Sequence, residues 1–389
     1  MDWHKKLSAQ LKVAESQYLL RSRKVIDSAQ DRQVMLDGQS LINFSSNDYL
    51  GFANHPKIAE AISQAASKWG CGSGSSHLVC GHQSINQQFE AEFADFVGAE
   101  AALLFSTGYM ANLGVLNSFF DREALILEDK LNHASLIDAA RLSRAEFRRY
   151  KHANILELEK LLESTARPSC IATDSVFSMD GDIAPIAQIS SLADTQGALC
   201  YFDDAHGFGV LGKEGRGSLD HFDLAPTGNR LMLATMGKAM GSFGAVVAAD
   251  KVFIDSLIQN ARPYIYTTAL PPTVVAANVA SLRLLQEESE RIKNLHSLIT
   301  HFRKNLSSMG VSLMASETAI QPIIIGDNEN ALACSDFLRE RGFLVTAIRP
   351  PTVPLNSARL RISLSAAHSL QDIDRLCDAL AQLKKQGLL

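Results

Sequence analysis

A single lysine, Lys238, follows an uncharged apolar run at residues 231–236 and ends the sequence Thr235-Met236-Gly237-Lys238. The run predicts a buried strand, so the lysine ammonium is expected to be partly desolvated at the strand's end. A desolvated lysine has a depressed pKa, and its neutral amine attacks carbonyl groups. Lys238 is therefore a candidate for covalent attachment to a carbonyl compound, although a lysine beside a strand is more often a surface residue.

A carboxylate, Asp203, ends a second apolar run at residues 199–202 and is followed by Asp204-Ala205-His206. Open α/β sheets form their ligand crevice at the carboxyl ends of the strands, so Asp203 is expected at that crevice. A carboxylate there can pair with a protonated pyridine nitrogen, the partner that pyridoxal phosphate chemistry requires. Asp203 and Lys238 together indicate this chemistry more specifically than either residue alone.

Further apolar runs between residues 100 and 180 also end in polar turns. The residues that follow them include Gly108, Tyr109, His133 and Ser178. Gly108 opens a predicted helix directly after a strand, and the amino end of such a helix binds anions. His133 could stack on a ring, but a histidine that opens a helix is more often a cap, and Tyr109 could equally be a packing residue.

The elements that must position these residues alternate in type. Between about residues 100 and 250, at least five predicted strands alternate with helical segments, which predicts a mostly parallel sheet between helices. Apolar spacing at Leu7, Leu11, Ala14 and Tyr18 predicts an amphipathic helix that the basic residues 21–24 would end. We expect a helical arm over 1–45, a large α/β domain over 46–280 and a smaller α/β domain over 281–389.

Two arginines, Arg359 and Arg361, alternate with apolar residues in a predicted strand of the C-terminal domain, so they share one strand face. Guanidinium groups that face a cleft can bind a carboxylate in a bidentate manner. The alternative is that the strand lies at a sheet edge, where positive charge discourages aggregation. The sequence leaves both interpretations open.

Composition excludes several classes of function. The chain has 389 residues and a net charge of −5, without a basic run, which argues against a nucleic-acid partner. No apolar run is long enough to cross a bilayer, and no signal-peptide core follows the first residues, so we expect no membrane partner and a cytoplasmic location. The six cysteines lack metal-site spacing and are expected to be reduced thiols, which predicts neither disulfides nor a metal.

The residues above resemble the α-oxoamine synthases, a family of pyridoxal-phosphate enzymes of fold type I. The resemblance rests on residues 45–51, 177–182 and 203–207 and on the Thr235–Lys238 turn, and it extends over essentially the whole chain. Residues 347–354 and 358–361 are similar, more narrowly, to the family member that acts in biotin synthesis. That similarity implies decarboxylative condensation of L-alanine with a pimeloyl thioester of coenzyme A or acyl-carrier protein.

The resemblance also implies roles for particular residues. Lys238, Asp203 and His133 would be catalytic: the lysine would hold pyridoxal phosphate and move the substrate proton, the aspartate would pair with the pyridine nitrogen, and the histidine would stack on the ring. The remaining cofactor residues would be Gly108, Tyr109, Ser178, His206 and Thr235, with Thr267 and Thr268 reaching the phosphate from the partner subunit of a homodimer. Substrate would contact Arg21, Asn47, His133, Arg349, Thr352 and Arg361.

Three positions depart from the family pattern: Ala239 and Ser75 replace common glycines, and Asn86 replaces a histidine. The Cβ of Ala239 could crowd its turn, because it restricts φ. None of the three removes a chemical group. The alternatives are another α-oxoamine synthase that uses glycine or a different acyl thioester, an aminotransferase, and a scaffold subunit without catalysis.

Overall fold

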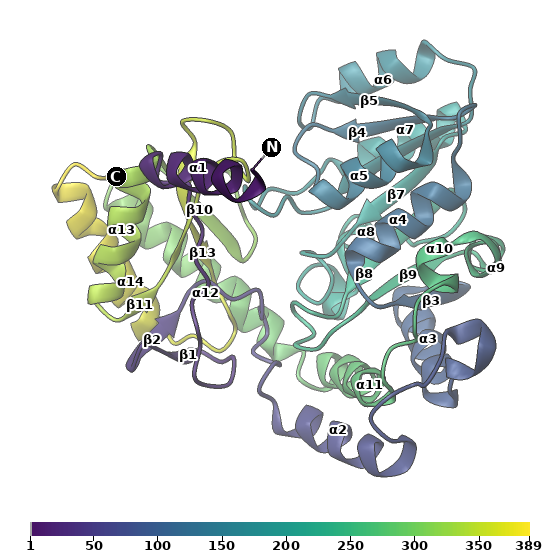
Figure 1. Ribbon diagram of the computed structural model, residues 1–389, viewed down its shortest axis with the longest axis horizontal. Coiled ribbons are helices and arrows are strands. Elements are labelled where there is room, and N and C mark those ends of the chain that lie inside the picture. The colour runs from purple at the N-terminus through teal and green to yellow at the C-terminus, as the bar shows by residue number, and fades with distance from the viewer. Residues whose placement is uncertain (1) are drawn as a thin grey trace. The chain divides into compact units, whose positions relative to one another are not determined.

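The computed structural model describes residues 2–389, which form two compact units (Figure 1). Unit 1 contains residues up to Tyr49, Met179–Gly181 and Asn294–Leu389, and unit 2 contains Leu50–Ser178 and Asp182–Lys293. The sequence places boundaries near 45 and 280, and that three-part division stays a prediction. In the described part of the chain, no helix is both long and apolar enough to cross a bilayer.

Unit 2 is built on a seven-stranded sheet in the order β3-β9-β8-β7-β6-β4-β5. Its strands are β3 (Ala101–Phe105), β4 (Leu125–Asp129), β5 (Glu146–Tyr150), β6 (Ser169–Asp174), β7 (Leu199–Asp203), β8 (Arg230–Thr235) and β9 (Ala245–Ala249). β9 pairs antiparallel with β3 and β8, and the remaining pairs are parallel. The predicted mostly parallel sheet is therefore confirmed.

Helices cover the sheet of unit 2, so its central strands are buried along their whole length and read as continuous apolar runs. The helices are α2 (Pro56–Trp69), α3 (Ser84–Val97), α4 (Gly108–Phe119), α5 (Ala134–Ser143), α6 (Ile155–Glu163), α7 (Ile186–Gln196), α8 (Ser218–His221), α9 (Lys251–Asn260), α10 (Arg262–Ile265) and α11 (Pro272–Glu287). A π-helical turn spans His77–Gly81 and a 3₁₀ turn spans Lys213–Gly215. Helices α4 and α5 lie side by side (Figure 1), and Val115 and Leu136 of this pair join the core that contains Ile126 of β4.

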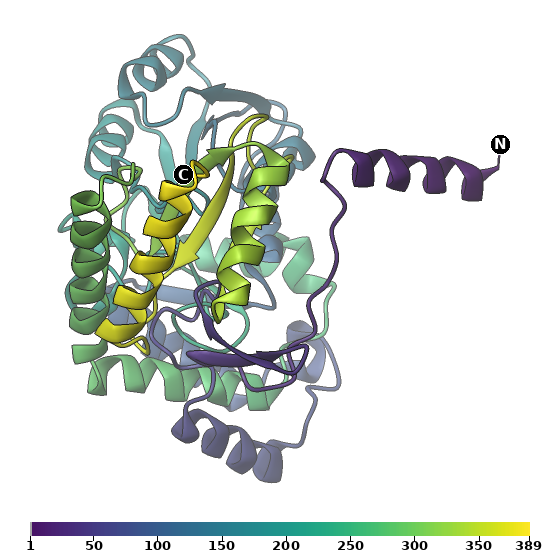
Figure 2. The same cartoon turned by 90° about the vertical axis from the view of Figure 1, so that its left-hand side faces the viewer.

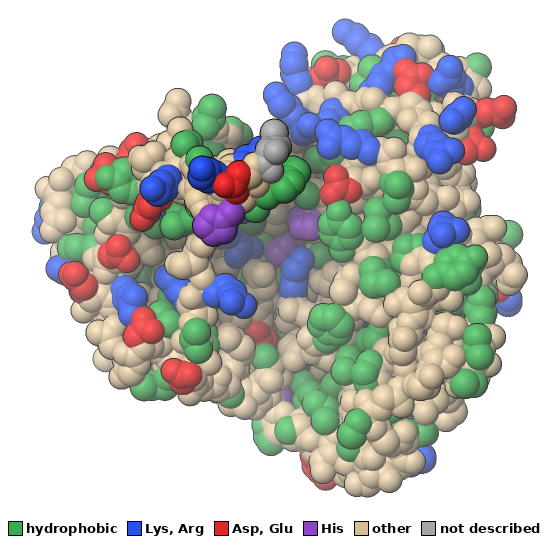
Figure 3. Space-filling view, in the orientation of Figure 1, with side chains coloured by type: hydrophobic (Ala, Val, Ile, Leu, Met, Phe, Trp, Pro, Cys, Tyr) green, Lys and Arg blue, Asp and Glu red, His purple; other side chains and the backbone are tan. Residues whose placement is uncertain are grey.

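The edge strand β5 differs from its neighbours because its arginines, Arg148 and Arg149, are exposed. Lys and Arg side chains gather over the end of unit 2 where β4 and β5 lie (Figure 3). Charged side chains on an edge strand discourage pairing with another chain. Polar residues in β5 also hid this strand from a search for apolar runs.

Unit 1 contains two three-stranded sheets, ordered β1-β2-β11 and β10-β13-β12. The strands are β1 (Gln33–Leu36), β2 (Gln39–Asn43), β10 (Ile320–Gly326), β11 (Phe343–Leu344), β12 (Thr346–Ile348) and β13 (Ala358–Ser363). Helices α13 (Asn328–Glu340) and α14 (Leu370–Lys385) lie side by side over them (Figure 2). The boundary between residues 293 and 294 falls within α12 (Glu290–Ser308).

The predicted N-terminal helix is present as α1 (Trp3–Ser16), which buries no side chain and extends away from the sheets of its unit (Figure 2). It ends before the basic residues 21–24, so the expectation that they end the helix is wrong. Tyr18 has a φ of 57°, a left-handed conformation that stops the helix at this point. Arg21 is therefore too far along the chain to complement the helix dipole.

The three departures from the family pattern fit the local structure. Ala239 is buried, and its φ is not positive, so its Cβ does not strain the turn as expected. Its Cβ packs against Gly209, where an added Cβ would come within 2.8 Å of it. Asn86 caps α3 by accepting a hydrogen bond from Gln83 N at 3.0 Å. The backbone of Ser75 lies close to Gly81: a Cβ added to Gly81 would stand 2.1 Å from the Ser75 carbonyl oxygen.

Candidate active site

One cavity of about 290 Å³ lies at the carboxyl edge of the unit 2 sheet. Parallel strands end at the same sheet edge, so the turns after β3, β4, β6, β7 and β8 meet there, together with the residues that enter the antiparallel β9. The lining includes eight residues that the sequence singles out: Gly108, Tyr109, His133, Ser178, Asp203, His206, Thr235 and Lys238. Polar residues scattered over 131 positions of the sequence, from Gly108 to Lys238, are thus brought together by topology alone.

Asp203 lies at the tip of β7 with 6% of its surface exposed. Its Oδ2 accepts a hydrogen bond from Asn112 Nδ2 at 2.8 Å, and its Oδ1 accepts one from Ala205 N at 3.1 Å. A buried carboxylate with two donors is held in one orientation and stays able to pair with a cation in the cavity.

Asn112, which the sequence did not single out, supports Asp203 through a hydrogen bond. It stands one helical turn after Gly108 in α4, donates to Asp203 and Ser135 Oγ at 2.8 Å each, and accepts from Tyr201 OH at 2.7 Å. The Asn112 side chain is buried, and its hydrogen bond fixes the orientation of the Asp203 carboxylate. Its place on the same helix face as Gly108 was the signal that could have found it.

His133 caps α5 at the cavity wall, where its Nδ1 lies 2.7 Å from Ser135 Oγ. Partial desolvation lowers the pKa of His133 and outweighs the Asp203 carboxylate, which acts in the opposite direction. A neutral imidazole can stack on an electron-poor ring without repelling a nearby cation. Asp174, also missed from the sequence, accepts a hydrogen bond from His133 N at 3.1 Å, and burial raises the pKa of its carboxyl well above the usual range.

The amino end of α4 has the features that suit an anion. Thr107 caps the helix by accepting from Met110 N at 3.1 Å, so the amides of Gly108 and Tyr109 open toward the cavity at the positive end of the helix dipole. A Cβ added to Gly108 would come within 3.0 Å of Thr235 Cγ2, so glycine keeps this end of the cavity open. Tyr109 OH donates to Asp138 at 2.5 Å.

Thr267 and Thr268 lie outside the cavity lining, in the segment after α10. Thr267 is half-buried and Thr268 is exposed. Both belong to the same unit as Lys238. Their predicted contact with a partner subunit's phosphate stays a prediction.

The predicted substrate residues other than His133 belong to unit 1. Arg361 lies in β13 and donates to Asn47 Oδ1 at 3.0 Å and Ser363 Oγ at 2.8 Å. Arg21 donates to Thr352 Oγ1 at 3.0 Å, and Arg349 donates to the carbonyls of Tyr18 and Leu20. These last three predicted residues line a second cavity of about 670 Å³ within unit 1.

The edge-strand interpretation of Arg359 and Arg361 is wrong, because β13 is the middle strand of its sheet. The two arginines nevertheless differ. Arg359 Nη1 lies 2.6 Å from Asp180 Oδ1, and it also donates to the Met179 carbonyl at 3.1 Å. Arg359 is therefore engaged by a carboxylate of this chain, and the contacts given above for Arg361 are to an amide oxygen and a hydroxyl.

The cavity fits pyridoxal phosphate in the chemistry of its donors. A helix amino end suits the phosphate, a fixed buried carboxylate suits the pyridine nitrogen, and a single lysine lines the same space. The described residues contain no cluster of His, Cys, Asp and Glu that could hold a metal ion.

Comparison with known proteins gives the same class. The family model for aminotransferase class I and II matches residues 39–380. The chain is 52% identical over 367 residues to 8-amino-7-oxononanoate synthase of Methylococcus capsulatus, covering 94% of this chain and 95% of the relative. It is 47% identical over 378 residues to the synthase of the same name from Cellvibrio japonicus, covering 97% and 95%.

Solved structures are similar over comparable lengths. Serine palmitoyltransferase of S. paucimobilis, solved with bound pyridoxal phosphate and myriocin, has a TM-score of 0.94 at 27% identity and covers 100% of both chains. The 8-amino-7-oxononanoate synthase of Francisella tularensis has a TM-score of 0.78 at 32% identity and covers 90% of this chain and 99% of the other.

The chain belongs to the aminotransferase class I and II family, as a pyridoxal-phosphate-dependent enzyme of fold type I. Within that family it belongs with the α-oxoamine synthases, which are acyltransferases, and its relatives from Methylococcus and Cellvibrio are both 8-amino-7-oxononanoate synthases. The expectations of fold class, enzyme class and cofactor are confirmed.

Proposed function

We propose that the chain is an 8-amino-7-oxononanoate synthase of biotin synthesis. It would condense L-alanine with a pimeloyl thioester, releasing carbon dioxide and the thiol carrier. The observation that carries the proposal is the meeting of Lys238, Asp203 and His133 in one cavity, in a chain 52% identical to a synthase of that name. The free state of all six cysteines, which lie within the described residues, supports a reducing compartment such as the cytoplasm.

Pyridoxal phosphate, when bound, supplies an electron sink for the bonds broken at the amino acid's α-carbon. In the proposal, Lys238 Nζ would hold the cofactor covalently, and it would then take and return the proton at that carbon. Asp203 would keep a proton on the ring nitrogen, and the His133 imidazole would cover one ring face. Ser178 and His206 would bond the ring oxygen, while Gly108, Tyr109 and Thr235 would help to hold the cofactor.

The proposed roles of the unit 1 residues concern the substrates. Arg361 would bind the alanine carboxylate through its planar guanidinium, with Asn47 orienting it through the bond at 3.0 Å. Arg21, Arg349 and Thr352 would line the path of the acyl thioester.

An amino-acid panel tests the proposed function. The purified protein is given pimeloyl-CoA or pimeloyl-acyl-carrier protein with alanine, glycine or serine, and released thiol is measured. Thiol release that is fastest with alanine supports the proposal, and the faster thioester identifies the carrier. Release that prefers glycine indicates another α-oxoamine synthase, and pyruvate formed without thiol, once a 2-oxo acid is added as amino acceptor, indicates an aminotransferase.

Substitution of the two β13 arginines separates their roles. Alanine binding is followed by the change in the absorbance of the bound cofactor. Arg361→Ala is expected to raise the alanine concentration needed for half of this change at least about tenfold, because one charge-assisted pair is lost. Arg361→Lys should rescue little, because lysine lacks the planar fork. Cofactor should stay bound in both variants.

Arg359→Ala is the comparison for that titration. It leaves Asp180 unpaired, with only 14% of its side chain exposed, so urea unfolding should show a loss of about 3–5 kcal/mol. Alanine affinity should change little in the folded fraction. Unchanged alanine affinity in Arg361→Ala would mean that the carboxylate binds elsewhere.

We also propose a homodimer with shared active sites. The support is that Thr267 and Thr268 lie outside their own chain's cavity lining, although the family resemblance implies contact with the phosphate. Sedimentation should give a dimer, and Thr268→Val should weaken cofactor retention, whereas Thr300→Val, at an exposed residue of α12, should not. An active monomer at assay concentration would contradict the proposal.

A further inference from the structure

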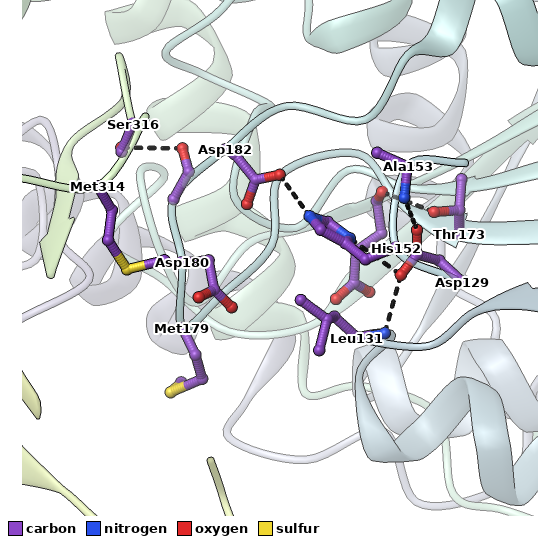
Figure 4. Close-up of polar contacts among 12 residues, drawn as sticks. Asp129, Leu131, His152, Ala153, Thr173, Met179, Asp180, Asp182, Met314 and Ser316 are labelled. Carbon is purple, nitrogen blue, oxygen red and sulfur yellow. Dashed lines mark hydrogen bonds and ion pairs between the residues drawn. The ribbon is translucent and has the colours of Figure 1, made fainter. Parts of the chain in front are cut away.

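His152 lies outside the cavity lining, in the segment after β5, yet it contacts the turns that carry two lining residues. Its Nδ1 is 3.1 Å from Asp129 Oδ1, and its Nε2 is 2.8 Å from Asp182 Oδ2 (Figure 4). All three residues belong to unit 2. Two carboxylate acceptors require a proton on both ring nitrogens, so His152 is an imidazolium.

Asp182 connects this imidazolium to the loop that carries Ser178. Asp182 O accepts from Phe177 N at 3.0 Å, and Val176 bridges Ile183, so the loop is closed at its base. The His152 ring also meets the Phe177 ring edge-to-face, with centroids 4.5 Å apart. His152 thus contacts the residues at both ends of the Ser178 loop.

Asp129 connects the same imidazolium to the turn that carries His133. It ends β4, and its carboxylate accepts from Leu131 N and Ala153 N at 2.8 Å each (Figure 4). Its carbonyl accepts from Asn132 N at 3.2 Å, directly before His133. The Asp129 side chain is only 2% exposed, so this ion pair is shielded from solvent on one side.

We propose that His152 is a positioning residue that fixes the Ser178 loop and the His133 turn relative to each other through its two carboxylate partners. This rests on the proposed function, in which Ser178 and His133 contact the cofactor. Loss of the imidazolium removes this link between the two turns, which then keep only their other contacts, such as the pair of Asp180 with Arg359 and the bond from His133 N to Asp174. Burial alone would lower the pKa of His152, but Asp129 and Asp182 outweigh it and raise the pKa to about 10, so the clamp persists at neutral pH.

Amide hydrogen exchange on the cofactor-free protein tests the positioning role of His152 independently of catalysis. His152→Gln is expected to speed exchange in peptides covering residues 130–134 and 176–184 by about tenfold. The matched control is His301→Gln, since His301 also pairs with an aspartate, at 2.6 Å from Asp374 Oδ1, and is 33% exposed against 30% for His152. The control should leave both peptides unchanged. Unchanged exchange in His152→Gln would overturn the proposal.

A double-mutant cycle with Ser178→Ala tests the path of the effect. If His152 acts through Ser178, His152→Gln lowers kcat/KM for thiol release about tenfold in the native background and less than about twofold beside Ser178→Ala. Additive losses would contradict the proposed path. Should His152→Gln fail to fold, Asp182→Asn removes the charge from the loop side and gives the same two readouts. A failure of the proposed function is distinct, because it removes thiol release from the unsubstituted protein and leaves the exchange result intact.

Discussion

Lys238→Ala is expected to fold normally and to lose thiol release by at least about 10⁴-fold. The variant loses both the covalent attachment of the cofactor and the group that moves the proton at the α-carbon, and proton transfer alone is worth about 10²–10⁴-fold. Lys238 is half-buried at the cavity wall, so its truncation to alanine enlarges the cavity and leaves the hydrophobic core intact. Unchanged far-UV circular dichroism would show that the loss is chemical.

Borohydride reduction of the unsubstituted protein gives the corresponding positive result. The yellow cofactor should become fixed to the peptide that contains Lys238. Two lysines in the same unit, Lys213 and Lys251, serve as internal controls because both pair with surface aspartates. Label on either of these peptides would refute the assignment of Lys238.

Asp203→Asn is expected to fold and to bind cofactor, but to lose at least about 10²-fold in turnover. An amide cannot keep the ring nitrogen protonated, so the electron sink is weakened in addition to the loss of one charge-assisted bond, itself about 1.5–3 kcal/mol. The asparagine carbonyl can replace only one of the two carboxylate oxygens, so the variant keeps the bond from Asn112 Nδ2 or the bond from Ala205 N but not both.

The neighbouring Asp204 provides the control for that substitution. Asp204 accepts from Ser218 N at 2.7 Å, lies outside the cavity lining, and burial raises its pKa to about 7. Asp204→Asn should therefore lower the free energy of unfolding and leave the turnover of the folded protein largely unchanged. Near-normal turnover in Asp203→Asn, or an equal loss in Asp204→Asn, would reject the role of Asp203.

The clustering of the candidate site residues in one cavity could be predicted because they share one simple position. Asp203 ends an apolar strand, Ser178 and Lys238 follow one, and parallel topology brings such strand ends to one edge. Continuous apolar runs also located β3, β4, β6, β7 and β8, because strands that are buried on both faces contain few polar residues.

Other features depend on contacts that no local pattern contains. Asn112 supports Asp203 from a separate helix, and a single polar residue on a helix face does not reveal its partner. Strand alternation placed Arg359 and Arg361 on one face of the strand. Only the fold shows that Asp180 forms an ion pair with Arg359. β5 escaped notice because its exposed arginines interrupt the apolar run.

The measurement that tests the central claim most directly is the stoichiometry of the reaction with alanine labelled at the carboxyl carbon. The protein is incubated with this alanine and pimeloyl thioester, and carbon dioxide, free thiol and product mass are followed together. The proposal predicts equal amounts of labelled carbon dioxide and thiol, with an unlabelled nine-carbon amino ketone that retains the nitrogen of alanine. Labelled pyruvate, or thiol release without labelled carbon dioxide, would contradict it.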